Sequence, residues 1–329
     1  MSTDIHARST PTEYAAPFGP IAALYLPATR PDRFIKALTS GADAVLLDLE
    51  DAVPAASKES ARDEAVRLLT ERATASGAEA DRNREIAVQV RINSLWSPWW
   101  ERDAAAIAEL IDRLPVARPT AVRVPKVESP EQVCRVAELL DGGASVLPLY
   151  CLIETARGLE AAYEIASAHP SVAGIALGEA DLAGDLGVTD AGLDWARSRL
   201  VVAARAAGLP SPAMSAYPRL DDADGLYASC VAGRRAGFLG RSVLHPKQIP
   251  AVIRAFTPPP ADVAAAEATL DALGRADILD GGTAVLPDGS FVDRAMAETA
   301  YRTLGMHRRT TEMAARMDGS ARTAARETA

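Results

Sequence analysis

The sequence predicts an α/β fold, a (β/α)8 TIM barrel followed by a C-terminal helix–hairpin–helix arm. Apolar runs of strand length alternate with helical segments from residue 21 to about residue 256. Most of these runs are continuously apolar, which is typical of a parallel sheet that is covered on both faces. Eight such runs occur, and eight is the strand number of this barrel. A doubly wound open sheet is the alternative fold.

Each unit pairs one strand candidate with one helix candidate. The helical segments place apolar residues at positions i, i+3, i+4 and i+7, as in Phe34–Gly41 and Ile249–Phe256. Ser129–Gln132 is typical of a helix start, with a serine cap and a proline in the first turn. The predicted strands are residues 21–27, 44–49, 86–92, 121–127, 146–153, 172–178, 212–217 and 239–244.

The pattern changes after the three prolines that follow Thr257. We predict a helix over about 261–275, a Gly-rich turn, a hairpin over 283–292 that turns at 287–289, and a helix near 294–306. The terminal segments are polar and lack periodicity, which indicates disorder. The predicted parts are a disordered N-terminal tail, the barrel, a lid or oligomerisation arm, and a disordered C-terminal tail, over residues 1–19, 20–257, 258–307 and 308–329.

The composition excludes several classes of protein. A net charge of −9 and a pI near 5.1 argue against a general nucleic-acid or anionic-membrane surface. The N-terminus lacks the apolar core of a signal peptide, and no apolar run approaches the ~20 residues of a membrane span. The three cysteines lie in periodic apolar segments, which is typical of buried thiols in a reducing compartment. We therefore expect a soluble, cytoplasmic protein that binds neither nucleic acid nor membrane.

Two carboxylates end two consecutive apolar runs: Glu154 follows residues 145–153, and Asp181 follows residues 172–180. A buried acid costs desolvation and adds nothing to packing, so two of them at strand ends indicate a ligand. In a barrel the active site lies at the carboxyl ends of the strands, where these acids would face each other. Because oxygen-only ligands suit Mg²⁺, we expect Glu154 and Asp181 to hold this ion.

Further polar residues share the predicted carboxyl ends of the strands, and structural roles compete with catalytic ones among them. Asp48, Glu50 and Asp51 can cap the helix that follows, and Arg91 can pair with one of these acids. Lys126 can pair with Glu128, and we interpret His245 as a packing residue. A whole ring of charges is costly unless it binds something, which favours a ligand site. The other members of this ring are Asn93, Ser215 and Tyr217.

Several common active sites are missing from the sequence. There is no G-x-S-x-G elbow, no G-x-x-x-x-G-K-[ST] loop and no G-x-G-x-x-G fingerprint. The four histidines, at positions 6, 169, 245 and 307, are scattered, which argues against a His-rich zinc site.

Five segments carry a family resemblance: Leu24-Tyr-Leu-Pro-Ala-Thr-Arg-Pro-Asp-Arg-Phe34, Gly41-Ala-Asp-Ala-Val-Leu-Leu-Asp-Leu-Glu-Asp-Ala-Val53, Ile153-Glu-Thr-Ala-Arg-Gly-Leu159, Gly178-Glu-Ala-Asp-Leu-Ala-Gly-Asp-Leu-Gly187 and His245-Pro-Lys-Gln-Ile249. The chain resembles the citrate lyase β-subunit-like (HpcH/HpaI) family over roughly residues 21–305. It is similar to the CoA-ester lyases of that family, which act on citryl-, malyl- and citramalyl-CoA.

The resemblance implies a Mg²⁺-dependent carbon–carbon lyase on a TIM barrel, with a CoA thioester and a small 2-oxo acid as ligands. Glu154 and Asp181 match the metal ligands of the family. Arg91 matches the arginine that binds the oxo or carboxylate group of the substrate, and we expect Glu50 and Asp51 to bind substrate beside it.

The resemblance also implies contacts to CoA and a lid. Arg30, Arg33 and Lys58 fall near the segments that hold the CoA phosphates in such enzymes. Phe291–Asp293 resembles the lid motif, whose aspartate enters a neighbouring subunit's active site and handles the acetyl-CoA proton in malyl-CoA lyase-like relatives. We therefore expect a homo-oligomer, a trimer or hexamer, with Asp293 as a catalytic residue.

Two departures from the family pattern concern the substrate and the lid. Ala213-Met214 stands where many relatives have an apolar residue and an aspartate. Arg294 follows the lid aspartate, where a proline is usual.

Three rival functions fit the same residues. One is a thioesterase of the same family, which hydrolyses malyl- or citramalyl-CoA and needs the same metal pair. Another is an aldolase that acts on free 2-oxo acids without CoA. The third is a non-catalytic CoA- or metal-binding subunit of a larger complex. The basic residues near the CoA segments and the C-terminal arm favour the free-standing lyase.

Overall fold

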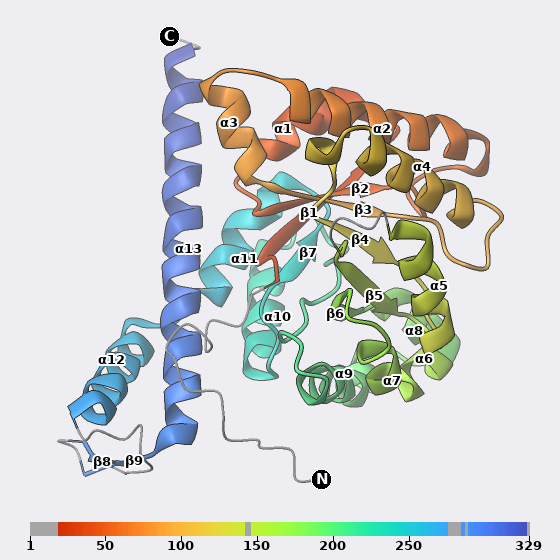
Figure 1. The fold of residues 1–329 in the computed structure, drawn as a ribbon. Coiled ribbons are helices and arrows are strands. Elements are labelled where there is room, and N and C mark those ends of the chain that lie inside the picture. The colour runs from red at the N-terminus through yellow and green to blue at the C-terminus, as the bar shows by residue number, and fades with distance from the viewer. Residues whose placement is uncertain (1–18, 142–145, 276–283, 287–288, 328–329) are drawn as a thin grey trace.

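A curled, parallel sheet of seven strands forms the centre of the molecule in the computed structural model, which describes residues 19–141, 146–275, 284–286 and 289–327 (Figure 1). The strand order is β6-β5-β4-β3-β2-β1-β7. Each neighbouring pair is parallel, as the apolar runs predict. The strands are β1 (Ala22–Pro27), β2 (Ala44–Asp48), β3 (Ala87–Arg91), β4 (Ala121–Val124), β5 (Leu149–Ile153), β6 (Val172–Leu177) and β7 (Arg241–Val243).

Helices surround this sheet and cover its outer face (Figure 1). They are α1 (Phe34–Leu38), α2 (Lys58–Thr74), α3 (Ala78–Glu85), α4 (Trp100–Arg113), α5 (Pro130–Leu140), α6 (Ala156–Glu160), α7 (Ala162–Ala166), α8 (Glu179–Leu186), α9 (Asp194–Ala206), α10 (Ala223–Arg235) and α11 (Ile249–Phe256). Short 3-10 turns are η1 (Pro31–Arg33), η2 (Ala55–Ser57), η3 (Pro115–Ala117), η4 (Asp190–Leu193) and η5 (Pro246–Gln248). The helix candidates with clear apolar periodicity are confirmed: Val252, Ile253 and Phe256 of α11 are all buried.

The seventh predicted strand, residues 212–217, is wrong as a strand, and the sheet is open at this place. Only Met214 forms a bridge, to Arg241: the Met214 amide donates to Gly240 O (2.7 Å) and the Ser242 amide donates to Met214 O (3.0 Å). The described residues show no pairing between this segment and β6. The physical reason is the proline content of the segment, because Pro210, Pro212 and Pro218 have no N–H to donate to a ladder.

The sheet is followed by α12 (Pro260–Arg275), the antiparallel pair β8 (Ala284–Val285) and β9 (Phe291–Val292), and α13 (Arg294–Glu327). The predicted helix and hairpin are therefore present, while residues 276–283 and the turn residues 287–288 lie outside the described part. The N-terminal tail predicted for residues 1–19 also lies outside it, except for Gly19. No described helix is long and apolar enough to cross a membrane.

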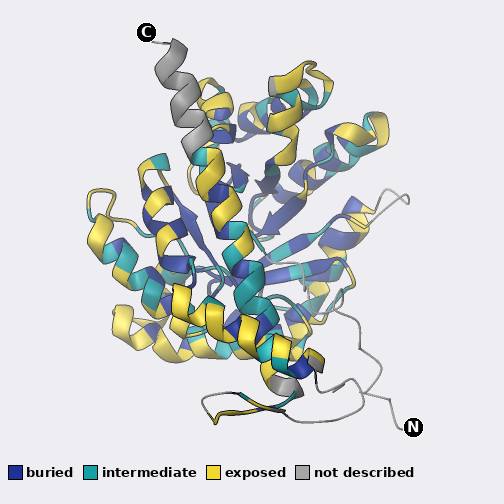
Figure 2. Cartoon of the chain, turned by 90° about the vertical axis from the view of Figure 1, so that its left-hand side faces the viewer, coloured by how far each residue is buried: buried dark blue, intermediate teal, exposed yellow. Residues whose placement is uncertain are grey.

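Helix α13 continues through most of the segment for which the sequence predicts a disordered tail, as far as residue 327. Its buried side chains include Met306, Thr310 and Met313, which are spaced by four and three residues along one helix face. Figure 2 shows α13 crossing in front of the buried strands. Packing of this face against the rest of the protein thus orders a segment whose composition is polar.

Arg309 fastens α13 to the amino-terminal end of the sheet. Its guanidinium donates to Gly19 O (2.9 Å) and to Asp43 Oδ2 (2.9 Å). The same Asp43 carboxylate accepts from the amides of Ile21 and Ala22, each at 2.9 Å. One carboxylate therefore links the start of β1 to the last helix.

We predict that Met313→Ala lowers the free energy of unfolding by about 2–4 kcal/mol, because it removes a fully buried side chain. Glu312→Ala, at the exposed neighbouring position, is the control and changes stability by less than about 0.5 kcal/mol. Urea unfolding of both variants checks this. Equal stability of the two variants would mean that the segment is a disordered tail after all.

Candidate active site

A buried ion pair joins the carboxyl ends of β2 and β3. Asp48 and Arg91 are register partners at these ends. Arg91 Nε donates to Asp48 Oδ1 (2.7 Å) and Nη2 donates to Oδ2 (2.6 Å), which is a bidentate arrangement. The Asp48 oxygens also accept from the amides of Glu50 (2.9 Å) and Ala52 (3.3 Å). The prediction that Arg91 pairs with an acid of this segment is confirmed, and Asp48 shapes the turn after β2.

Glu50 is buried next to this pair and lies between two cations. Its Oε2 is 2.8 Å from Arg91 Nη1, and its Oε1 accepts from Lys126 Nζ (2.8 Å). Burial raises the pKa of the Glu50 carboxyl to about 7, although the charges of Arg91 and Lys126 lower it. Asp51 is more exposed and lies 3.3 Å from Arg91 Nη1 and 3.4 Å from Lys126 Nζ.

Lys126 connects the acids of β2 with the acid of β5. Its ammonium contacts Glu50 and Asp51 and lies 3.9 Å from Glu154 Oε2. The backbone of Lys126 has φ = +53°, a left-handed conformation that a side-chain-bearing residue rarely adopts. The ion pair of Lys126 with Glu128 that the sequence leaves open is not formed, since Glu128 accepts from Thr155 Oγ1 instead (2.8 Å). Backbone strain at the end of β4 thus accompanies a lysine that points to the acid cluster.

Glu154 follows the last residue of β5 and is almost completely buried, with 2 % of its surface exposed. Its Oε2 has no hydrogen-bond partner among the described residues. Burial raises the pKa of this carboxyl to about 8, and the charges of Glu50 and Asp181 act in the same direction. An acid in this state is costly in the apo protein and is suited to a cation.

Gly178, at the end of β6, makes room for this carboxylate. A Cβ atom at residue 178 would lie 2.5 Å from Glu154 Oε1 and closer still to Cγ. Because such contacts do not occur, any larger residue at this position would displace the Glu154 side chain.

Asp181 lies in the first turn of α8 and is exposed. The expectation that it closes the strand itself is wrong, because β6 ends at Leu177 and Gly178 caps the helix. The helix starts early because Glu179 and Asp181 favour its amino-terminal turn. The charge of Asp181 is one of those that raise the pKa of Glu154, so the two acids act on each other electrostatically.

The basic residues predicted to contact CoA have different surroundings. Lys58 is buried, and its ammonium donates to Leu49 O (2.9 Å) and Glu50 O (2.7 Å), so it supports the β2 turn instead of facing solvent. Arg30 follows β1, is partly exposed and donates twice to Asp32, at 2.9 and 2.8 Å. Arg33 is also exposed. Only the two arginines are therefore accessible to a phosphate in this structure.

Asp293 directly follows β9 and starts α13. Its backbone carbonyl accepts from the Met296 amide (3.1 Å), and so does its Oδ1 (3.3 Å). The β8–β9 pair lies away from the seven-stranded sheet (Figure 1). The structure therefore does not bring Asp293 of this chain into the acid cluster.

The other polar strand-end residues have structural partners. His245 is exposed and caps η5 by accepting from the Lys247 amide at its Nδ1 (3.1 Å), which is a structural role other than packing. Asn93 donates to Asp103 Oδ2 (2.6 Å), and Tyr217 donates to Asp222 Oδ2 (2.6 Å).

The sequence analysis underestimated the importance of Lys126 and Asp48 for the site. For Lys126 the only available signal was a lysine at a strand end, since a left-handed backbone cannot be read from composition.

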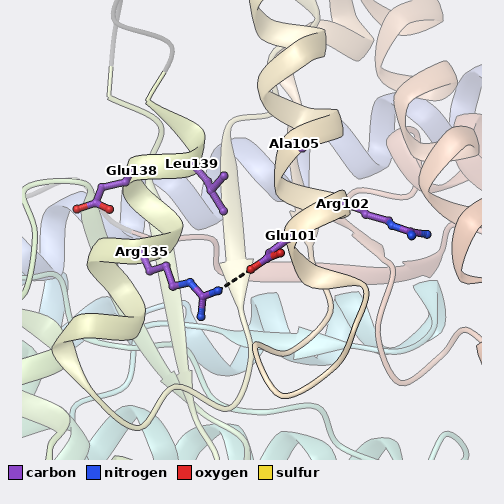
Figure 3. A pocket seen from close by; sticks show the side chains of 6 residues that line it. All are labelled: Glu101, Arg102, Ala105, Arg135, Glu138 and Leu139. Atoms are coloured by element: carbon purple, nitrogen blue, oxygen red, sulfur yellow. Dashed lines mark hydrogen bonds and ion pairs between the residues drawn. The ribbon is translucent and has the colours of Figure 1, made fainter.

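A surface hollow of about 640 Å³ lies elsewhere, between α4 and α5 (Figure 3). It contains one ion pair, between Arg135 Nη2 and Glu101 Oε1 at 2.5 Å, and both side chains are exposed. Glu138 and Leu139 complete its wall. Exposed ion pairs contribute little to stability. None of the described residues that line this hollow is a buried polar residue, so we assign no function to it.

The acid cluster fits a hard divalent cation. The described residues contain no group of three or more histidine, cysteine, aspartate or glutamate side chains arranged for a metal. Mg²⁺, however, commonly takes one or two carboxylates and completes its octahedron with water and substrate oxygens. Glu154, whose Oε2 has no hydrogen-bond partner among the described residues, and Asp181 are the two carboxylates that would hold such an ion.

Comparisons with known proteins identify relatives of the chain. A sequence model of a family described as HpcH/HpaI aldolase/citrate lyase matches residues 22–246. A (3S)-malyl-CoA thioesterase of Cereibacter sphaeroides is 35% identical over 289 residues, which are 85% of this chain and 92% of that protein. An L-malyl-CoA/β-methylmalyl-CoA lyase of Rhodobacter capsulatus is 28% identical over 305 residues, 84% of this chain and 91% of that one. The structure of CitE from Mycobacterium tuberculosis in complex with magnesium, acetoacetate and coenzyme A is also similar, with a TM-score of 0.67 and 30% identity, covering 89% of this chain and 99% of that chain.

The raised pKa of Glu154 predicts a pH-dependent stability in the absence of metal. Its native pKa of about 8 exceeds the unfolded value of about 4.3, so the native state holds a proton that the unfolded state releases between these values. The contribution of the Glu154 proton to the free energy of unfolding is therefore fully present below about pH 4.3. It is lost as the pH rises through about 8.

Urea unfolding in a chelating buffer at pH 6 and pH 9 measures this effect. Between these pH values, the wild type is expected to lose roughly 2 kcal/mol more than Glu154→Gln, in which the ionisable group is absent. Glu50 titrates in the same pH range and is coupled to Glu154, so the difference between the two proteins reports Glu154 together with this coupling. Parallel pH profiles of the two proteins would contradict the raised pKa.

Proposed function

The chain belongs to the HpcH/HpaI aldolase/citrate lyase family, and from this premise we propose that it is a Mg²⁺-dependent lyase of CoA esters. Its substrate would be a 3-hydroxyacyl-CoA whose hydroxyl-bearing carbon also carries a carboxylate, as in malyl-, citramalyl- or citryl-CoA. The products would be an acyl-CoA and a 2-oxo acid. The observation that carries this proposal is the buried Glu154 carboxylate with an unpartnered oxygen, next to Asp181 and to the Arg91 cluster.

Glu154 and Asp181 would hold the Mg²⁺ ion, and the substrate carboxylate and hydroxyl would occupy its open positions. When bound, the ion supplies Lewis-acid polarisation of these oxygens and fixes their orientation. The excess of acids over cations in the cluster supports this assignment. Among the described residues, Arg91 and Lys126 are the cations that form ion pairs with four of the acids, Asp48, Glu50, Asp51 and Glu154.

Arg91 would bind the oxo-acid part of the substrate. Its Nε and Nη2 are occupied by Asp48, which fixes the plane of the guanidinium. Its contact to the half-exposed Asp51 is longer, at 3.3 Å, and is the one that a substrate carboxylate can replace. Arg91 therefore offers a pre-oriented donor at the point where the new carbonyl forms.

In the cleavage direction, the substrate hydroxyl loses its proton and its C–O bond becomes a carbonyl. At the same time the bond between the hydroxyl-bearing carbon and the α-carbon of the thioester breaks. The electron pair passes to the thioester enolate, which then takes up a proton at carbon. Glu50 is suited to accept the hydroxyl proton, because its pKa of about 7 matches the working pH of a general base.

Asp293 would deliver the proton to the enolate carbon from the arm of a neighbouring subunit in a homo-oligomer, a trimer or hexamer. This arrangement agrees with its position away from the cluster of its own chain. Arg30 and Arg33 would bind the CoA phosphates, whereas Lys58 supports the β2 turn. An Asp293→Asn variant that still exchanges the α-proton of acetyl-CoA at the wild-type rate would remove Asp293 from the mechanism.

A thioesterase is the second candidate, because a malyl-CoA thioesterase is among the relatives at 35% identity. The reaction would break the C–S bond of the thioester with water and would leave the carbon skeleton intact. The same two acids would serve it.

The products of the reaction test the proposal. We expect purified protein with Mg²⁺ to convert malyl- or citramalyl-CoA into acetyl-CoA and a 2-oxo acid, identified by mass. Glu154→Gln and Asp181→Asn should lose more than the roughly 10–100-fold that removal of an outer-shell partner of a metal costs. Circular dichroism confirms that both variants fold. Free CoA with an intact hydroxy acid would establish the thioesterase, and full activity of either variant would refute the metal site.

Gly178→Ala provides a separate test of the Glu154 position. The added methyl group displaces the Glu154 carboxylate, so Mg²⁺ is expected to bind at least ~10-fold more weakly. Gly184→Ala in α8 is the matched control, because a Cβ there meets no atom within 4 Å. Isothermal titration with Mg²⁺ compares the two. Equal Mg²⁺ affinity of both variants would show that Glu154 is not a ligand.

A further inference from the structure

A buried arginine without a carboxylate partner lies inside the curled sheet. Arg123, in β4, has 2 % of its surface exposed. Its Nε donates to Gln89 Oε1 (2.8 Å), and its guanidinium lies 5.4 Å from the centre of the Tyr150 ring. Among the described residues, no carboxylate forms an ion pair with it. The similarly buried Arg62 differs, because it pairs with Asp103 at 2.8 Å.

The groups around Arg123 do not neutralise its charge. Gln89 is neutral, and burial raises the pKa of both Tyr25 and Tyr150, so these phenols stay protonated. Tyr25 shares a hydrogen bond with Arg123 but is neutral, and Arg91, another cation, acts on Arg123 with a charge of the same sign. The guanidinium itself cannot lose its proton in a protein. A buried cation in such surroundings costs several kcal/mol unless an anion compensates it.

Arg123 lines a small cavity at the open side of the sheet. The other walls are Tyr150, the β6 residues 173–176 and the proline-rich segment 210–213. The cavity exists because this segment does not pair with β6. The volume of this cavity is about 20 Å³, counted as the space that the centre of a water molecule can occupy. One particle of that size fits, whereas a phosphate or a carboxylic acid is too large.

We propose that one small monovalent anion of the size of chloride binds in this cavity against the Arg123 guanidinium. The ion compensates the buried charge, and its other neighbours are the neutral Tyr150 side chain and the walls of the cavity. Tyr25, whose ring also lies 5.0 Å from the Arg91 guanidinium, separates this anion from the acid cluster. The anion site is thus distinct from the candidate active site.

A larger cavity of about 370 Å³ adjoins the Arg123 cavity. It lies at the amino-terminal ends of the strands, next to Asp43 and Arg309. It shares Pro20, Tyr150, Ala173 and Pro210 with the Arg123 cavity. The surroundings of Arg123 therefore adjoin a hollow on the face opposite to the acid cluster.

Thermal unfolding at constant ionic strength tests the proposal. Replacing sodium gluconate by sodium chloride, up to about 150 mM, is expected to raise the Tm of the wild type by about 2 °C or more. Gluconate is too large for the cavity and serves as the inert salt. Bromide fits as well as chloride and should have the same effect.

Two variants separate binding at Arg123 from general salt effects. Arg123→Gln should lose the chloride-dependent rise in Tm. Arg62→Gln, which removes a buried arginine that already has an acid partner, should keep it. A chloride effect of the same size in Arg123→Gln, or no chloride effect in the wild type, would overturn the proposal.

Crystals of the wild type soaked in bromide give a test that needs no variant. An anomalous peak next to the Arg123 guanidinium is the expected result. A featureless map at this position, with bromide visible elsewhere on the protein, would overturn the proposal. Neither measurement depends on the lyase activity, so failure of the proposed function leaves this test intact.

Discussion

The bidentate ion pair between Asp48 and Arg91 is the interaction on which the candidate site depends. It closes the ends of β2 and β3, and its carboxylate also accepts from two amides of the turn that follows. A buried pair of this kind gains little net stability, because desolvation offsets most of its attraction. Its contribution is orientation: it fixes the guanidinium plane and, through the turn, the position of Glu50.

The rest of the cluster is a balance of charges around this pair. Glu50 and Glu154 are both buried acids with raised pKa values, and Lys126 reaches toward each of them from a left-handed backbone position. Small side chains matter as much as charged ones, since only glycine at 178 leaves space for the Glu154 carboxylate. Such a site is poorly satisfied without a ligand, which is typical of functional sites that trade stability for binding.

The sequence was sufficient for most of the sheet and for the region of the site, for identifiable reasons. Continuous apolar runs predict buried parallel strands, and the carboxyl ends of such strands meet at one edge, so Glu154 and Arg91 could be placed together. Residues 212–217 misled because their apolar pattern starts at Pro212 and is flanked by Pro210 and Pro218, and prolines cannot donate to a strand ladder. The continuation of the last helix beyond residue 306 was missed because its buried residues there, Thr310 and Met313, are sparse within a polar segment. The assignment of Asp181 to a strand end failed by one helical turn, within the usual uncertainty of element boundaries.

The contact of Arg309 with Gly19 and Asp43 has a consequence for the order of folding during synthesis. It joins residues that are 290 and 266 positions apart in the chain. The amino-terminal edge of β1 therefore stays incomplete until residue 309 has left the ribosome. Contacts of such long sequence separation form late, since the chain must first lose a large amount of conformational freedom. During synthesis the first strand would thus have to wait for a helix that is made almost three hundred residues later.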